Sequence, residues 1–208
     1  MMMSENVSAI PPSLDCVIDH AISLPKTSAP TTLASLSGSD ESSVTTELHK
    51  LTGKWDMYYH LPHNTSWDLA SYKKIFSGIN LAEQAILLND AVPEIIIKSC
   101  MLFVMREGIT PLWEDPKNRN GGCFSFKISN NSVCNVWKNV FYSLLGGTLF
   151  KDRSLEKQIN GITISPKKNF CILKIWMAGM EIQNPELITD IHGLTKNGCI
   201  FRGHKPEY

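Results

Sequence analysis

Two tryptophans lie in stretches of the sequence where a large apolar side chain is not expected to belong to a core. Trp67 follows the polar loop 62–66, and Trp113 lies in the polar segment 110–122, which contains proline and glycine. Surface loops of this kind often carry binding residues, so both indoles are placed where a ligand can reach them. The carboxylate of Glu114 stands next to Trp113. We take these three side chains as candidate binding residues.

The elements that must position these residues are visible as strand and helix patterns. Residues 55–61 alternate in period two, with Trp55 on the inward face, which predicts a half-buried strand. The apolar run 100–105 is short and continuous, as in a central strand. Further strands are expected at 67–76, 123–128, 162–164, 170–176 and 199–202.

Helical spacing of apolar residues runs from Val133 to Leu144, with Trp137 in the middle of the stripe and Gly146-Gly147 after it. Two more helices are expected, at 79–88 and at 184–192; the second begins with Asn-Pro and ends before a glycine. Because hairpin-length links join several strands, we predict an α+β fold. It would contain one curved, mainly antiparallel sheet with helices on one face.

Composition and length exclude several classes of protein. The chain has 208 residues, 43% of them hydrophobic, and a net charge of zero, which is ordinary for a globular protein and sufficient for a core without disulfides. No apolar stretch approaches the roughly 20 residues that span a bilayer, and residues 1–5 do not resemble a secretory signal. The cysteines form no C-x-x-C pair, so we expect no metal site, a reducing compartment and residence in the cytoplasm or nucleus.

The first 48 residues differ from the rest. They hold ten Ser, five Thr and four Pro, no aromatic residue, and six acidic residues against one Lys. Such a segment buries too little apolar surface to offset the entropy of ordering, so we predict a disordered tail at 1–48 and one domain at 49–208. Within the tail, 14–24 is apolar enough to form a short helix on a partner, although a solvated linker is the favoured interpretation.

One segment resembles a known family. Residues 108–122, GITPLWEDPKNRNGG, closely resemble the cap-binding loop of eukaryotic translation initiation factor 4E. The resemblance covers about residues 49–204 and includes the order and spacing of five tryptophans: Trp55, Trp67, Trp113, Trp137 and Trp176. It implies a curved antiparallel sheet with helices on the convex face and a ligand slot on the concave face.

The resemblance also implies a ligand, the 7-methylguanosine cap of mRNA. Trp67 and Trp113 would sandwich the methylated base, whose delocalised positive charge is attracted to indole faces. Glu114 would accept hydrogen bonds from the base edge, and Trp176 would pack against the methyl group. Neither a cofactor nor catalysis is implied.

At the phosphate end the sequence departs from the family. Lys167 stands where the family has a phosphate-binding Arg, with Lys168 beside it. Another family Lys aligns with Ile172, which leaves Lys174 as a substitute, and a family Arg aligns with Cys123. Lysine lacks the bidentate fork of arginine, so we expect a looser grip on the phosphates. The alternative for Lys167-Lys168 is a solvated hairpin tip.

A second departure concerns the surface that the family uses to bind a scaffold-type initiation factor or a regulatory protein. We call it the partner face and assign to it His49, Glu83, Trp137 and Lys138. Glu83 and Lys138 stand where the family has Trp and Leu, so the apolar anchors of the usual interface are missing. We therefore expect changed contacts there, in a protein that is monomeric and does not associate with membranes.

The sequence favours cap binding in translation initiation, with capped mRNA as partner, and leaves three alternatives. A repressor or storage factor would bind the cap without recruiting the usual scaffold. An enzyme would use Cys123 as nucleophile with His60, His63 or His192 as base, although nothing in the sequence fixes such a pair. A small-molecule binding module would use the Trp slot for another planar cation.

The predicted tail gives a direct test. Removal of residues 1–47 should leave the affinity for a cap analogue unchanged within about twofold, because a segment without a core contributes little to a folded site. Titration of the full chain and the truncated chain with 7-methyl-GTP measures this. A truncated chain that fails to fold would contradict the assignment of these residues as a tail.

Overall fold

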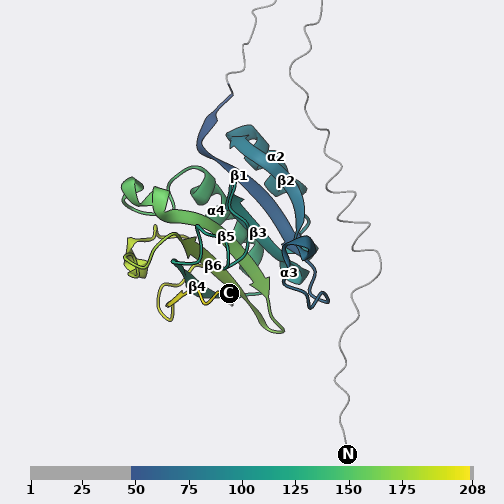
Figure 1. Ribbon diagram of the computed structural model, residues 1–208. Helices are drawn as coiled ribbons and strands as arrows, with labels where there is room; N and C mark the ends of the chain where they lie inside the picture. The colour runs from purple at the N-terminus through teal and green to yellow at the C-terminus, as the bar shows by residue number, and fades with distance from the viewer. Residues whose placement is uncertain (1–47, 207–208) are drawn as a thin grey trace, which may run out of the picture. The chain divides into compact units, whose positions relative to one another are not determined.

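The computed structural model describes residues 48–206, so almost all of the predicted tail, including 14–24, lies outside the described residues. The described residues contain seven strands in one sheet with the order β2-β1-β3-β5-β6-β4-β7, and all neighbouring strands are antiparallel (Figure 1). The strands are β1 (Lys50–His60), β2 (Lys73–Leu81), β3 (Met101–Arg106), β4 (Gly122–Ser129), β5 (Ile159–Pro166), β6 (Phe170–Met177) and β7 (Ile200–Gly203).

Among residues 48–206, three α-helices cover the convex face of this curved sheet (Figure 1). They are α2 (Ala82–Ala91), α3 (Glu94–Ser99) and α4 (Val133–Leu145), and α4 is the longest. Short 3-10 turns lie at η1 (Leu69–Ser71), η2 (Arg153–Gln158) and η3 (Pro185–Leu187). The predicted α+β class, with helices on one face of an antiparallel sheet, is confirmed.

The two faces of the sheet carry different side chains. Along β6, Cys171, Leu173 and Ile175 are at most 1% exposed. The residues that alternate with them, Ile172, Lys174 and Trp176, line a cavity. Because successive side chains of a strand point to opposite faces, the first set packs under the helices and the second set lies on the concave face.

The first strand is more deeply buried than its alternating sequence predicts. Every residue from Trp55 to His60 is buried, because the concave face has an apolar cluster of its own. This cluster comprises Tyr58, Phe103, Met105, Ile109 and Trp176. The concave face is therefore packed at its floor, which gives the cavity above it a firm base.

Two predicted boundaries are wrong at the second strand and the helix after it. The residues directly after Trp67 form the 3-10 turn η1, and β2 then continues to Leu81, beyond the expected start of a helix at Ile79. The helix begins only at Ala82 because the side-chain oxygen of Gln84 accepts hydrogen bonds from the N–H groups of Asn80 and Leu81. This is a capping contact that ends the strand.

The helix expected at 184–192 is only the single turn η3. Asn184 does cap this turn by accepting a hydrogen bond from the N–H of Glu186, as the Asn-Pro pair suggests. The chain then pairs with another segment: Ile188 bridges Phe150, and the N–H of Thr189 donates to the carbonyl of Leu149. Tertiary backbone pairing thus replaces the local helix. The helix α3 was not expected, because six residues are too few to show a period.

Candidate functional site

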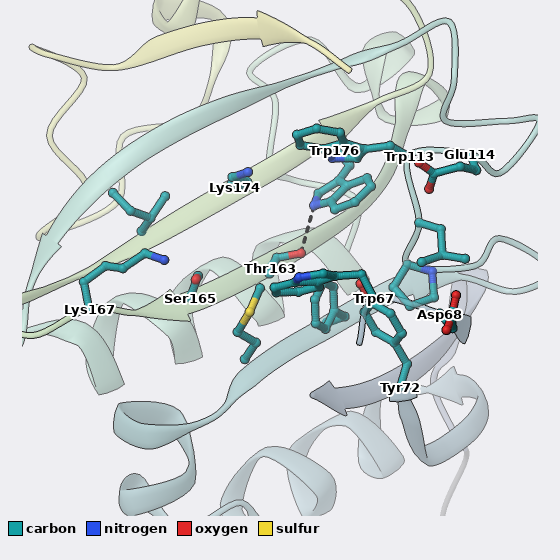
Figure 2. A pocket seen from close by; sticks show the side chains of 15 residues that line it. Trp67, Asp68, Tyr72, Trp113, Glu114, Thr163, Ser165, Lys167, Lys174 and Trp176 are labelled. Carbon is teal, nitrogen blue, oxygen red and sulfur yellow. Dashed lines mark hydrogen bonds between the residues drawn. The ribbon is translucent and has the colours of Figure 1, made fainter. Parts of the chain in front are cut away.

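A cavity of about 670 Å³ opens on the concave face of the sheet (Figure 2). It is lined by residues of β3, β5 and β6 and of the two loops that carry Trp67 and Trp113. This volume is within the usual range for small-ligand sites. The structure brings together six of the seven predicted ligand-binding residues, namely Trp67, Trp113, Glu114, Lys167, Lys174 and Trp176. Lys168 does not line the cavity; it is exposed at the turn between β5 and β6.

The loop of Trp113 and Glu114 is held from inside by two polar side chains. The carboxylate of Asp115 accepts hydrogen bonds from the N–H and hydroxyl of Thr110, at 2.8 and 2.7 Å. The side-chain amide of the fully buried Asn118 donates to the carbonyls of Thr110 and Leu112. Asp115 therefore stabilises the fold of the loop, whereas Glu114 faces the cavity. The sequence, in which the two carboxylates are adjacent, does not distinguish these roles.

Trp113 lies between two groups from distant parts of the chain. The ring of His204 stacks near it, with centroids 5.8 Å apart and planes at 12°, and the Lys174 ammonium is 5.5 Å from the indole centroid. His204 follows β7, and its backbone N–H donates to the carbonyl of Gly121. The end of the described chain thus packs against the loop that carries Trp113.

Trp67 projects from its loop and is 57% exposed, an unusually high value for an indole. Its ring stacks on the buried imidazole of His60, with centroids 4.6 Å apart and planes at 4°. The preceding turn is fixed by Asn64, whose side-chain oxygen accepts a hydrogen bond from the N–H of Ser66. The position of this indole is therefore set by a turn and by one stacked ring.

The cavity is also lined by residues that the sequence did not single out. Trp176, which was predicted, donates from its indole nitrogen to the hydroxyl of Thr163 at 2.8 Å (Figure 2). Tyr72 packs edge-on against Phe103, and its burial, together with the charge of Glu114, raises the pKa of its phenol to about 12. The other unpredicted lining residues are Asp68, Met101, Pro111, Leu112 and Ser165. In the sequence, the lining residues on strands could be recognised only as alternate residues that share one face of the sheet.

The polar ends of the cavity differ in charge. Among its lining residues the cations are Lys167 and Lys174, whereas Ile172 lines the wall at the position of the family Lys. Cys123 of β4 is buried. In the sheet it pairs with Trp176 of β6 on one side and with Arg202 of β7 on the other. Figure 2 shows the two lysines on one side of the cavity and Glu114 on the other.

Three of the four residues assigned to the partner face, His49, Glu83 and Lys138, have polar side-chain partners. His49 Nδ1 lies 2.8 Å from a carboxylate oxygen of Glu83, and Lys138 Nζ lies 2.6 Å from Asp90. Trp137 is fully buried, as its place in the helix stripe predicts, so it presents no surface to a partner. Exposed apolar side chains lie at Ile86 and Leu87 of α2 and at Ile95 of α3.

Within the described residues, Cys123 and His60 have hydrogen-bond partners other than each other. The thiol of Cys123 has the hydroxyl of Ser125 as its hydrogen-bond partner, 3.9 Å away, and His60 is bonded to the carbonyl of Ser66. Between residues 48 and 206, no cluster of His, Cys, Asp and Glu is arranged to hold a metal ion. In the same range, no helix has the length and apolar character needed to cross a membrane.

The buried His204 gives a pH-dependent prediction. Burial and the nearby Lys174 lower its pKa, so the folded chain favours the neutral ring, whereas the unfolded chain takes up a proton near pH 6.5. The free energy of unfolding should therefore fall as the pH drops below about 6.5, and less so for His204→Asn. Urea denaturation of both proteins at pH 7.5 and 5.5 measures this. Equal losses in the two proteins would contradict the assignment.

Comparisons with known proteins agree with this geometry. The sequence profile of the family described as eukaryotic initiation factor 4E matches residues 50–199. An initiation factor 4E homolog of Acanthamoeba polyphaga mimivirus is 48% identical over 63 residues, which are 30% of this chain and 23% of the relative. Initiation factor 4E of Eremothecium gossypii is 27% identical over 136 residues, 62% of each protein. The matched region thus spans less than two thirds of the length of either relative.

Solved structures have the same fold. Ascaris suum eIF4E-3 in complex with m7G cap aligns with a TM-score of 0.58 at 16% identity, over 65% of this chain and 76% of that chain. Caenorhabditis elegans eIF4E-3, in complex with the 4E-binding protein Mextli and a cap analog, aligns with a TM-score of 0.56 at 17% identity, over 64% and 76%. Since the family profile matches well over half of the sequence, from residue 50 to residue 199, this chain belongs to the eukaryotic initiation factor 4E family.

Proposed function

We propose that this chain binds the 7-methylguanosine cap of mRNA in the cavity on its concave face. The observation that carries the proposal is the position of Trp67 and Trp113 on two sides of one cavity, with Trp176 and Thr163 between them (Figure 2). A methylated guanine is flat and cationic, so both indole faces attract it. Stacking contributes about 1–3 kcal/mol per base, and the cation–π attraction adds up to about 2 kcal/mol when it is desolvated.

The charge distribution of the cavity matches the polarity of a nucleotide. Glu114 stands at one side, where its carboxylate would accept hydrogen bonds from the N–H groups of the base edge. Lys167 and Lys174 stand at the other side, where their ammonium groups would attract the phosphates. With Ile172 and Cys123 in place of two family cations, this end would hold the phosphates more loosely than the family pattern does. The proposed activity is binding without catalysis.

The base sandwich is tested by titration with 7-methyl-GTP and, separately, with GTP, followed by tryptophan fluorescence. We expect strong quenching and a clear preference for the methylated nucleotide, because only that base carries the positive charge. Trp113→Ala should weaken binding of 7-methyl-GTP about tenfold or more, since one stacking platform is lost. Unchanged affinity in this variant would rule out the sandwich, and no binding by the unaltered chain would rule out the proposed function.

The role of Glu114 is tested by removing its charge and keeping its shape. Glu114→Gln should weaken binding of 7-methyl-GTP by roughly tenfold, because a charge-assisted hydrogen bond contributes about 1.5–3 kcal/mol. The matched control is Glu181→Gln, which alters an exposed glutamate that does not line the cavity. Asp115 is unsuitable as a control, because its carboxylate folds the loop. Equal effects of the two glutamine variants would contradict the assigned role.

For the biological role we propose translation initiation in the cytoplasm, with translational repression or mRNA storage as the second candidate. The observation that favours the second candidate is the partner face. There Glu83 contacts the ring of His49 and Lys138 forms an ion pair with Asp90, at the two positions that we aligned with apolar family anchors. Partner proteins of the family's usual kind would therefore find changed contacts. The exposed Ile86, Leu87 and Ile95 nearby offer different apolar anchors.

A cell-free translation extract depleted of its own initiation factor 4E separates these two roles. Restored translation of a capped reporter on addition of this chain would support initiation. Inhibition of the capped reporter in an undepleted extract, without rescue of the depleted one, would support repression. An uncapped reporter driven by an internal ribosome entry site serves as the control, because its translation does not depend on cap binding.

A further inference from the structure

Each of the two tryptophans that flank the cavity is stacked against a buried histidine. His60 lies 4.6 Å from Trp67 with nearly parallel planes, at 4°, and His204 lies 5.8 Å from Trp113 with planes at 12°. The two histidines come from opposite ends of the domain, one from the end of β1 and the other from the residue after β7. The same arrangement thus occurs twice around one cavity.

Each of the two histidines forms a hydrogen bond between a ring nitrogen and a backbone carbonyl oxygen. His60 Nε2 lies 2.8 Å from the carbonyl oxygen of Ser66, the residue before Trp67. His204 Nδ1 lies 2.7 Å from the carbonyl oxygen of Asn118, in the loop that carries Trp113. Because a carbonyl oxygen only accepts, each of these ring nitrogens carries the proton. Each imidazole therefore anchors the backbone of a loop and stacks on the indole of the same loop.

The remaining ring nitrogens are evidence that the flat ring itself is needed. His60 Nδ1 and His204 Nε2 are buried without a hydrogen-bond partner in the described part of the chain. A buried polar atom without a partner is costly, so its presence at both places requires a compensating contribution. An aliphatic side chain would avoid this cost but would offer the indole no parallel surface.

Neither histidine is placed to touch a ligand. His60 is 1% exposed and His204 is 9% exposed, and neither lines the cavity. Any influence on binding must therefore pass through the groups that the histidines contact. These are the stacked indoles with their loops and two tilted rings of the cavity wall, Tyr72 at 5.0 Å from His60 and Trp176 at 4.9 Å from His204. This matters most for Trp67, which is more than half exposed and would otherwise sample many orientations. A side chain ordered before binding does not lose that entropy when the ligand arrives.

We propose that His60 and His204 are positioning residues, each of which fixes the plane of one indole so that the two indoles are held ready for a flat ligand. The proposal rests on the proposed cap-binding function for its effect on affinity. The expected size follows from the strength of aromatic pairs and from the cost of ordering a side chain, which together correspond to roughly threefold to tenfold in affinity per histidine.

Paired substitutions separate the ring from its hydrogen bond. His60→Gln retains an N–H donor near the Nε2 position and removes the ring, whereas His60→Phe retains a flat ring and removes the donor. The matching pair at the other indole is His204→Asn and His204→Phe. We expect the Phe variants to keep the affinity for 7-methyl-GTP within about threefold, and the Gln and Asn variants to lose about threefold to tenfold. The reverse order would overturn the proposal.

A double-mutant comparison tests whether each histidine acts through its own indole. In a Trp67→Ala background, His60→Gln should cause no further loss of affinity, because the indole that it positions is already absent. In a Trp113→Ala background, the same His60→Gln change should retain its full effect. Additive losses in the Trp67→Ala background would show a general structural role and would overturn the proposal.

A measurement on the protein without nucleotide makes the test independent of cap binding. Indole N–H resonances in a ¹H–¹⁵N spectrum, assigned with Trp67→Phe and Trp113→Phe, report the ring stacked on each indole. His60→Gln should shift the Trp67 signal and leave that of Trp113 in place, and His204→Asn should do the opposite. If the unaltered chain does not bind 7-methyl-GTP, the proposed function fails, yet these shifts still decide the positioning role. Unshifted signals would overturn it.

Discussion

The site depends on keeping two indoles apart on either side of a cavity instead of letting them collapse onto the apolar floor. Apolar surface is driven out of water, so an indole that is 57% exposed, as Trp67 is, needs a restraint. The restraints are local to each loop: the turn before Trp67, and the network around Asp115 and Asn118 for Trp113. Ring stacking from behind then sets the planes.

The sheet supports this arrangement because both of its faces are packed. Helices cover the convex face, and the aromatic and aliphatic cluster around Tyr58 and Phe103 fills the floor of the concave face. A strand that is buried on both sides has little freedom to bend, so the loops at its ends are held at fixed separation. The binding residues can therefore lie on loops and still be positioned by rigid elements.

The cavity combines aromatic walls with opposite charges at its two sides, and this combination suits a flat cation that carries phosphates. The departures from the family pattern that we expect from the sequence concern the cations and the partner face. Lys167 and Lys174 supply the positive charge of the cavity lining, and Ile172, which the sequence comparison aligned with a family Lys, lines the wall. The tryptophans and the glutamate that we propose to bind the base line the cavity together.

The sequence by itself determined features that depend on neighbours along the chain. The apolar period and the glycine stop define α4, alternation defines most strands, and the Trp113-Glu114 pair in a polar loop marks the site. Only the tertiary structure decided which distant residues meet. It brought His60 and His204 behind the indoles, gave Asp115 a structural role, and turned the predicted helix at 184–192 into a backbone pairing with Phe150. Local patterns report a residue's own preferences. Ring stacking and strand pairing depend instead on partners up to 91 residues away, as for Trp113 and His204. Residues so far apart along the chain form no periodic pattern that the sequence could show.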